Sequence, residues 1–169
     1  KQGADLLRSI HLERLAISIL EQSGYLEEAT DILKGLGAFD RAAVFYGAHG
    51  QWDSAIDCFI KAGKPFEAAM CARAAENHGI AAVNFDRAGH PEDAAECYVK
   101  VGNYLRGARL YLACGEHGKA TTALENIADH HLTRLLDEQE VATLRDHIQR
   151  NKIQGPVADA INRQHSKAG

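Results

Sequence analysis

The chain has 169 residues, and its hydrophobic fraction of 46% is enough for a buried core, which excludes a disordered tail. Its 19 Lys and Arg residues stand against 23 Asp and Glu residues, a net charge of −4 with no block of five like charges, so we expect no nucleic-acid-binding surface. No run of 18 apolar residues occurs, so we expect no membrane insertion.

Seven glycines lie on one thirteen-residue spacing, which is the strongest regularity in the sequence. A glycine just after a helix takes the left-handed conformation without steric cost, whereas other residues lose about 1 kcal/mol or more. The spacing therefore predicts one short helix and one turn in every thirteen residues. The series, interrupted only at Glu76, consists of Gly24, Gly37, Gly50, Gly63, Gly89, Gly102 and Gly115.

The residues between the glycines repeat as well. Counted from each glycine, the fifth residue is always small, and the ninth is mostly large, as in Tyr46 and Phe59. The fifth, eighth, ninth and twelfth positions share one face of a helix, so we predict that they form the buried stripe. Helices of about ten residues are too short to be stable alone, so neighbouring helices must stack.

In chain order, the repeat extends backwards from Gly24 to about Leu6, and because helical sequence begins almost at Lys1 we expect a segment of a longer protein. Prolines at the first helical position, where no N–H is needed, mark two helix starts at Pro65 and Pro91. Carboxylates in predicted first turns mark others, because they meet the positive end of the helix dipole. These carboxylates belong to Asp40, Asp53, Glu67, Glu92 and Asp93.

The repeat is irregular at two places. At Glu76 the glycine moves to Gly79, so we predict one lengthened helix, a shortened successor and a local bend rather than a domain boundary. Beyond Gly115 we predict a longer helix, then a helix with an Asp137–Glu140 capping box and a last helix from Pro156. We therefore predict a helical repeat array over residues 1–127, with residues 128–169 forming capping helices and a tail of the same domain.

The spacing of Ala55, Phe59 and Ala62, which recurs at residues 81, 85 and 88, resembles the second helix of the tetratricopeptide repeat. The stretch AAVFYGAHGQWDSAIDCFIKAGKPFEAAMCARA is also similar to the short-helix α-solenoids of coatomer subunits and intraflagellar-transport proteins, and to helical arms of large signalling ATPases and helicases. The resemblance implies an all-α fold, a TPR-like α–α superhelix. We expect a right-handed solenoid of antiparallel helix pairs, with thirteen residues for each helix and its turn, that organises other proteins.

The four cysteines are candidates for a metal site or for disulfide bonds. Cys58, Cys71 and Cys97 share the eighth position of the repeat and Cys114 the twelfth, so we predict that all four are core fillers in a reducing, cytoplasmic compartment. Cys114 lies ahead of three histidines with a spacing that loosely resembles a zinc finger, but the first Cys-x-x-Cys half is absent, so we predict no metal site. The histidines concerned are His117, His130 and His131.

Other candidate chemistry is absent from the sequence. We found no glycine-rich phosphate or dinucleotide motif and no metalloprotease or serine-hydrolase motif, so we expect no catalytic residue, no cofactor and no enzymatic activity in this segment. Four histidines stand at or near predicted helix ends, where they cap carbonyl groups or meet water. They are His49, His78, His90 and His117.

Two sets of residues are candidates for binding a partner protein or peptide. Trp52 follows a glycine of the series, as do Tyr25, Phe39 and Tyr104; these aromatic side chains either form an exposed row or attach each turn to the next helix. Arginines at polar positions of the repeat either line a groove for an acidic segment or are simply solvated. These arginines are Arg73, Arg87, Arg106 and Arg109.

The sequence thus leaves two functions open. The first is a non-catalytic scaffold or adaptor module that binds another protein or peptide. The alternative is a regulatory or sensor arm of a signalling ATPase, helicase or other large enzyme, whose partner is another domain of the same chain. The oligomeric state is also open, because the end of a helical array can stack on a second copy.

Overall fold

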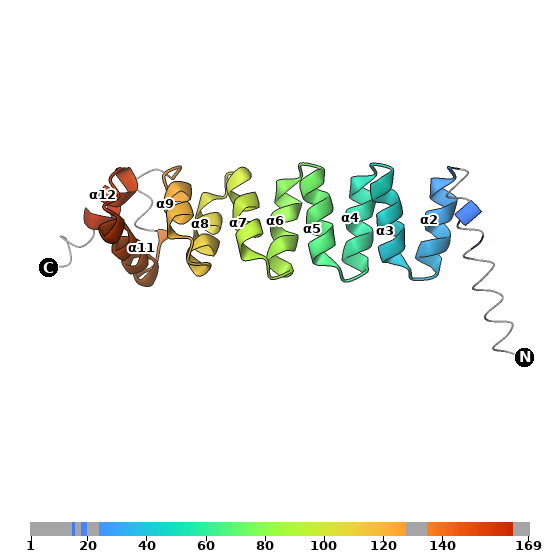
Figure 1. Ribbon diagram of the computed structural model, residues 1–169, viewed down its shortest axis with the longest axis horizontal. Helices are drawn as coiled ribbons and strands as arrows, with labels where there is room; N and C mark the ends of the chain where they lie inside the picture. Colours follow the sequence, from blue (N-terminus) through green and yellow to red (C-terminus); the bar gives the residue numbers. More distant parts are fainter. Residues whose placement is uncertain (1–14, 16–17, 20–23, 128–134, 164–169) are drawn as a thin grey trace, which may run out of the picture. The chain divides into compact units, whose positions relative to one another are not determined.

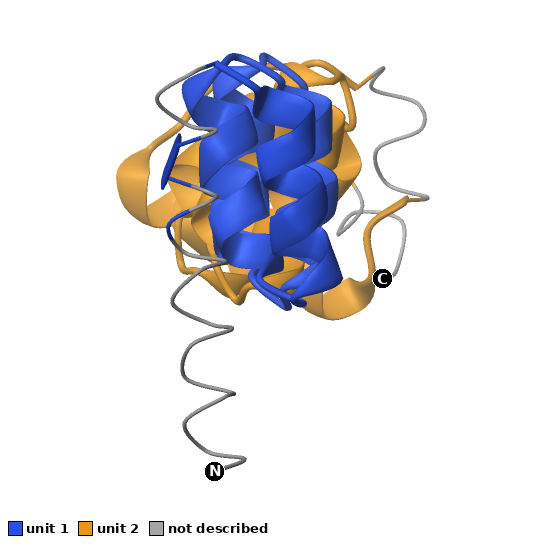
Figure 2. Ribbon diagram, turned by 90° about the vertical axis from the view of Figure 1, so that its right-hand side faces the viewer, with its two compact units in different colours: residues 1–77 blue, residues 78–169 orange. Residues whose placement is uncertain are grey.

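The computed structural model describes residues 15, 18–19, 24–127 and 135–163. These residues form ten α-helices and no strand, so the predicted all-α fold is confirmed. The chain divides into two compact units, residues 1–77 and residues 78–169, which are coloured separately in Figure 2. Within each unit successive helices pack against each other, the arrangement of an α–α superhelix.

Unit 1 contains four described helices of ten residues each. Consecutive helices run antiparallel and lie side by side in chain order (Figure 1). Because α4 packs against both α3 and α5, it separates two helices that run in the same direction. The helices are α2 (Leu26–Gly35), α3 (Phe39–Ala48), α4 (Trp52–Lys61) and α5 (Pro65–Ala74).

Unit 2 contains the other six helices. The helices α6 to α9 continue the short repeat, while α11 is longer and packs against α9 and α12. The helix α11 begins with the predicted capping box, and α12 begins at Pro156 as predicted. The bounds are α6 (His78–Arg87), α7 (Pro91–Lys100), α8 (Tyr104–Ala113), α9 (His117–Leu124), α11 (Glu138–Asn151) and α12 (Pro156–Arg163).

The glycines of the series from Gly37 to Gly115 follow the ends of described helices, as predicted. All seven glycines have φ between 70° and 79°, the left-handed region. After α3, for example, the Gly50 N–H donates to the carbonyl of Gly47 and the Gln51 N–H to that of Tyr46, at 3.1 and 2.9 Å. These bonds satisfy carbonyl groups that the end of the helix leaves without a helical partner.

The prediction of a shifted helix boundary after α5 is wrong. Glu76 itself takes the left-handed conformation, with φ of 59°, and the Asn77 N–H donates to the carbonyl of Ala72 as in the other turns. Gly79 lies inside α6, and α5 and α6 both keep ten residues. The thirteen-residue repeat is therefore uninterrupted, and the two compact units meet in sequence directly after this turn, between Asn77 and His78.

The buried stripe differs from the prediction at the sixth and twelfth positions, and the eighth position is buried in four of its eight described residues. The alanines at the fifth position are fully buried, and the ninth position is buried throughout. The twelfth position is not: Leu36 and Val101, 49% and 48% exposed, directly follow α2 and α7 as C-cap residues. The sixth position is buried instead, because a helix such as α3 or α4, with a neighbour on each side, needs a wider apolar face. Its residues are Thr30, Ala43, Ile56, Ala69, Ala82, Ala95, Ala108 and Thr121.

The predicted helix starts are confirmed. Pro65 and Pro91 are the first residues of α5 and α7, and the five predicted carboxylates lie in first turns. The predicted longer helix after Gly115 is wrong in the described residues, because α9 ends at Leu124 after eight residues. No helix in the described ranges is long and apolar enough to cross a membrane.

Candidate functional site

Two surface hollows lie in unit 1. The first, here called the Trp52 hollow, has a volume of about 490 Å³ and lies where the turn before α4 meets the end of α5. The second, the Val44 hollow, has a volume of about 380 Å³ and lies between the first turns of α3 and α5. The Trp52 hollow is lined by Gly50, Gln51, Trp52, Asp53, Ser54, Ala75 and Asn77, and the Val44 hollow by Asp40, Arg41, Val44, Phe45, Phe59, Lys64 and Glu67.

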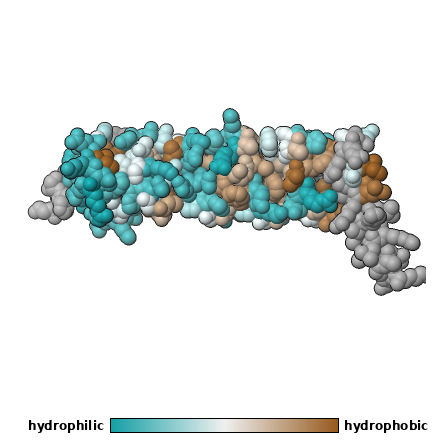
Figure 3. Space-filling view, in the orientation of Figure 1, coloured by the Kyte–Doolittle hydropathy of each residue, from teal (hydrophilic) through white to brown (hydrophobic). Residues whose placement is uncertain are grey.

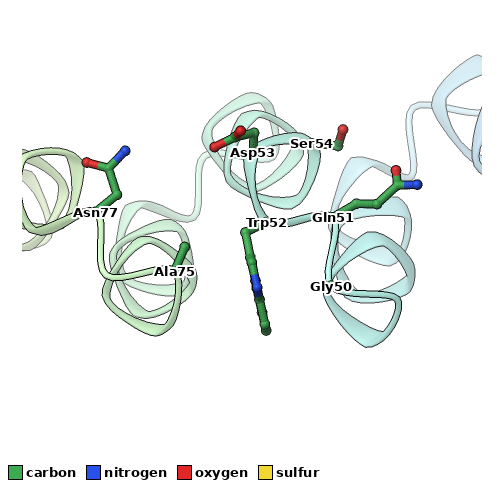
Figure 4. A pocket seen from close by; sticks show the side chains of 7 residues that line it. All are labelled: Gly50, Gln51, Trp52, Asp53, Ser54, Ala75 and Asn77. Carbon is green, nitrogen blue, oxygen red and sulfur yellow. The ribbon is translucent and has the colours of Figure 1, made fainter.

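Trp52 is held at the start of α4 and reaches into the gap between α3 and α5 (Figure 4). Its ring lies over the backbone of α3, since a methyl group built on Gly47 would stand 3.9 Å from the ring. The side chain is nevertheless 36% exposed, because the hollow leaves its other side open towards Ala75. Trp52 therefore attaches the turn to α3 and presents an aromatic surface as well.

Asp53 leaves the start of α4 on the side opposite to the ring, towards Asn77 (Figure 4). Its side chain is exposed and makes no hydrogen bond or ion pair with any residue that the structure describes. No residue that lines the Trp52 hollow is basic. The hollow therefore combines an aromatic surface with a carboxylate that lacks a counter-charge.

The Val44 hollow is apolar at its centre and charged at its rim. Val44 is 63% exposed on α3, Phe45 beside it is half-buried, and Phe59 of α4 forms the buried floor. Lys64, just before α5, pairs with Asp40 of α3 at 3.1 Å, which lowers the pKa of the Asp40 carboxyl. This ion pair joins the starts of the two helices and closes one end of the hollow.

One face of α4 contributes an aromatic side chain to each hollow. Trp52 and Phe59 are seven residues apart, two helical turns, so both point into the gap between α3 and α5. The rise along α4 between them is about 10 Å. The two hollows therefore lie along the same gap in unit 1, one aromatic and acidic and the other apolar, and together they are here called the α3–α5 groove. Figure 3 shows more hydrophobic surface over α3 to α5 than over α11 and α12.

The four predicted arginines do not line either hollow. Arg73 is half-buried on α5 and donates to the sulfur of Met70 at 3.0 Å, and Arg87 is exposed in the last turn of α6. Arg106 pairs with Asp86 at 2.9 Å and its guanidinium lies 4.6 Å from the centre of the Tyr98 ring.

Arg109 is likewise engaged within unit 2. Its Nε donates to Glu140 of α11 at 2.8 Å, and its Nη2 donates to the carbonyl of Leu135 at 2.7 Å. Both ion-paired arginines thus hold helices of unit 2 together. Their binding of an acidic partner stays a prediction, which would require these contacts to be exchanged.

Sequence reasoning found Trp52 but missed the rest of the groove. Val44 occupies the seventh position of the repeat, where most other helices carry a charged or polar residue such as Asp57 or Glu96. An apolar residue at an outward position is a usable signal of a binding surface. Tyr25 is 57% exposed, whereas Phe39 and Tyr104 are half-buried, so the aromatic residues do not form a uniform exposed row.

The cysteines are placed as predicted except for one. Cys58 and Cys97 are buried and Cys71 is half-buried, but Cys114 is exposed, because the twelfth position follows the helix rather than belonging to its face. Burial raises the pKa of Cys58 and Cys71. Partial desolvation, together with the nearby carboxylates of Glu92 and Glu116, raises the pKa of Cys114, so these three thiols stay protonated. All four cysteines lie in the described part of the chain, and none forms a disulfide bond.

The histidines stand at helix ends as predicted. His49 follows α3 and its Nδ1 is 2.9 Å from the carbonyl oxygen of Phe45, while His78 and His117 begin α6 and α9. His130 and His131 lie outside the described residues. Within the described ranges no three His, Cys, Asp or Glu side chains are placed to hold a metal ion.

Comparison with known proteins assigns this chain to no family. The chain matches no protein-family model, and no curated protein and no solved structure is significantly similar to it.

Proposed function

We propose that this chain is a non-catalytic interaction module that binds a segment of another protein in the α3–α5 groove of unit 1. The observation that supports it most is Val44, an apolar residue exposed at 63% directly over a hollow floored by Phe59. A short apolar side chain that enters this hollow removes the exposed apolar surface of Val44 from water, which contributes about 25 cal/mol for each Å² buried.

The construction of the groove favours binding over catalysis. Both walls are helices whose fully buried alanines keep neighbouring helices close, so the groove exists before a partner arrives. The resemblance to the repeats of coatomer subunits and intraflagellar-transport proteins agrees with such a role, since those helical arrays hold other proteins. As part of the proposal, we assign the tetratricopeptide-like character of the helices to packing and the function to this groove.

Peptide display tests this proposal. Random twelve-residue peptides on phage are selected against the immobilised chain, and the variants Val44→Glu and Val83→Glu are used in parallel. Val83 is the matched control because it is an exposed valine at the same repeat position on α6, in unit 2. We expect enriched peptides whose binding falls at least tenfold with Val44→Glu and stays within twofold with Val83→Glu.

Two results would contradict the proposal. Enriched peptides that bind Val44→Glu as well as the original chain would place the site elsewhere. A chain that enriches no peptide above a blank surface would leave the regulatory arm of a larger enzyme, acting on its own chain, as the remaining interpretation.

A further inference from the structure

We infer that the groove recognises an extended protein segment that carries a basic side chain and an apolar side chain three residues apart. The basic side chain occupies the Trp52 hollow and the apolar one the Val44 hollow. This inference rests on the proposed function, and it specifies the chemistry of the partner segment.

Charge complementarity selects the basic residue. Asp53 is exposed and has no partner among the described residues, and no lining residue of the Trp52 hollow supplies a positive charge. Glu76, which lies in sequence between the lining residues Ala75 and Asn77, is exposed and adds a second carboxylate nearby. An acidic partner side chain would meet like charge here, whereas a Lys or Arg head finds its counter-ion.

The chemistry of the Trp52 hollow also matches a long basic side chain. The ring of Trp52 and the carboxylate of Asp53 both line the hollow and diverge from the start of α4 (Figure 4). A lysine or arginine has an aliphatic stem that packs against an aromatic ring and a charged head that pairs with a carboxylate.

The Val44 hollow favours an apolar partner residue because the charged side chains at its rim already balance each other. The ion pair between Lys64 and Asp40 satisfies two charges at the rim, and Arg41 and Glu67 contribute one of each sign. The centre offers Val44, Phe45 and Phe59, which hold no hydrogen-bonding side-chain group. An apolar side chain such as leucine therefore matches the lining of this hollow.

The spacing follows from helix geometry. Trp52 and Phe59 are seven residues apart on α4, a rise of about 10 Å. A polyproline II segment advances about 3.1 Å per residue and completes a turn in three residues, so residues three apart point the same way and lie about 9 Å from each other. In this conformation, two side chains three residues apart reach the two hollows together.

A fluorescence titration of the full chain tests the inference, because Trp52 is its single tryptophan and reports directly on the first hollow. The probe is acetyl-Ser-Pro-Arg-Ser-Pro-Leu-Ser-amide, whose prolines favour the extended form. Its matched probes replace Arg by Ala, Arg by Glu, or Leu by Ala. We expect the Arg–Leu probe to change the Trp52 emission and to bind about tenfold more tightly than each matched probe.

Two variants distinguish the effect of the carboxylate in the Trp52 hollow from the effect of the net charge of the chain. Asp53→Asn is expected to weaken the Arg–Leu probe about tenfold and to leave the probe with Ala in place of Arg unchanged. Asp57→Asn is the control, because Asp57 is an exposed aspartate on the same helix that lines neither hollow. It is expected to change both affinities by less than twofold.

The outcomes distinguish this inference from the proposed function. If the Glu–Leu probe binds as well as the Arg–Leu probe, or if Asp53→Asn has no effect, the assignment of a basic partner is wrong. If displayed peptides bind in a manner that depends on Val44 and yet lack a basic residue, the groove stands and this inference fails. If neither displayed peptides nor probes bind, both are wrong.

Discussion

At the scale of single residues, Glu76 is the exception within a regular series. It takes φ of 59° at a position where seven other turns use glycine. For a residue with a Cβ atom this conformation costs about 1 to 2 kcal/mol. The position lies next to the Trp52 hollow, where a carboxylate adds to the charge that we assign to partner binding.

The substitution Glu76→Gly should therefore stabilise unit 1. We expect a gain of about 1 kcal/mol in the free energy of unfolding, measured by urea denaturation, because glycine adopts this φ without strain. Glu76→Gln is the control, since it removes the charge and keeps the strained backbone. An equal gain from both variants would show that the charge, not the conformation, is responsible.

A second residue-scale prediction concerns Gly107, which stands at the fifth position, where the seven other described helices of the repeat have alanine. A Cβ atom there would lie 2.6 Å from a methyl group of Val99 and 3.1 Å from the carbonyl oxygen of Ala95. Gly107→Ala should cost about 1 to 3 kcal/mol of stability by overpacking. Gly118→Ala, whose Cβ meets no atom within 4 Å, should be neutral or stabilising; equal losses in both variants would contradict this packing.

At the scale of elements, the contact between α9 and α11 contains a histidine pair. The rings of His117 and His147 are 5.3 Å apart, edge to face. Burial lowers the pKa of His147, and the neighbouring charges of His117 and Arg150 lower it further. The folded chain therefore favours the neutral form of His147.

This pKa shift predicts the direction of a pH effect. The unfolded chain binds a proton at His147 near its ordinary pKa of 6.5, while the folded chain resists that proton to lower pH. The stability of unit 2 should therefore be greatest above pH 6.5 and decrease as the pH falls through 6.5. Thermal unfolding at pH 7.5 and 5.5 checks this; His147→Gln should reduce the difference in Tm, and an unchanged difference would exclude His147 as its source.

The sequence was sufficient to predict most elements, because their boundaries depend on local chemistry. Glycine, proline and first-turn carboxylates act within one or two turns, so the starts at Pro65 and Pro91 and the capping box of Asp137 were predictable. The burial of the sixth position was not, since it depends on each helix having two neighbours. The groove was missed for the same reason, because residues from separate helices line its hollows only after α3, α4 and α5 have packed together.

At the scale of the whole molecule, two compact units share one repeat. Helices of ten residues are too short to be stable alone, so the stability of each unit comes from contacts between successive helices. The ion pairs of Arg106 and Arg109 lie within unit 2, whereas the candidate groove lies entirely within unit 1. We therefore expect partner binding to be confined to unit 1.

Hydrogen–deuterium exchange of the full chain, with and without saturating Arg–Leu probe, would locate the binding surface. We expect slower exchange in peptides that cover α3 to α5, residues 39–74, and in the turn that contains Glu76. We expect unchanged exchange in α11 and α12. Protection confined to unit 2, or no protection while the probe is bound, would contradict the assignment of the binding surface to the α3–α5 groove.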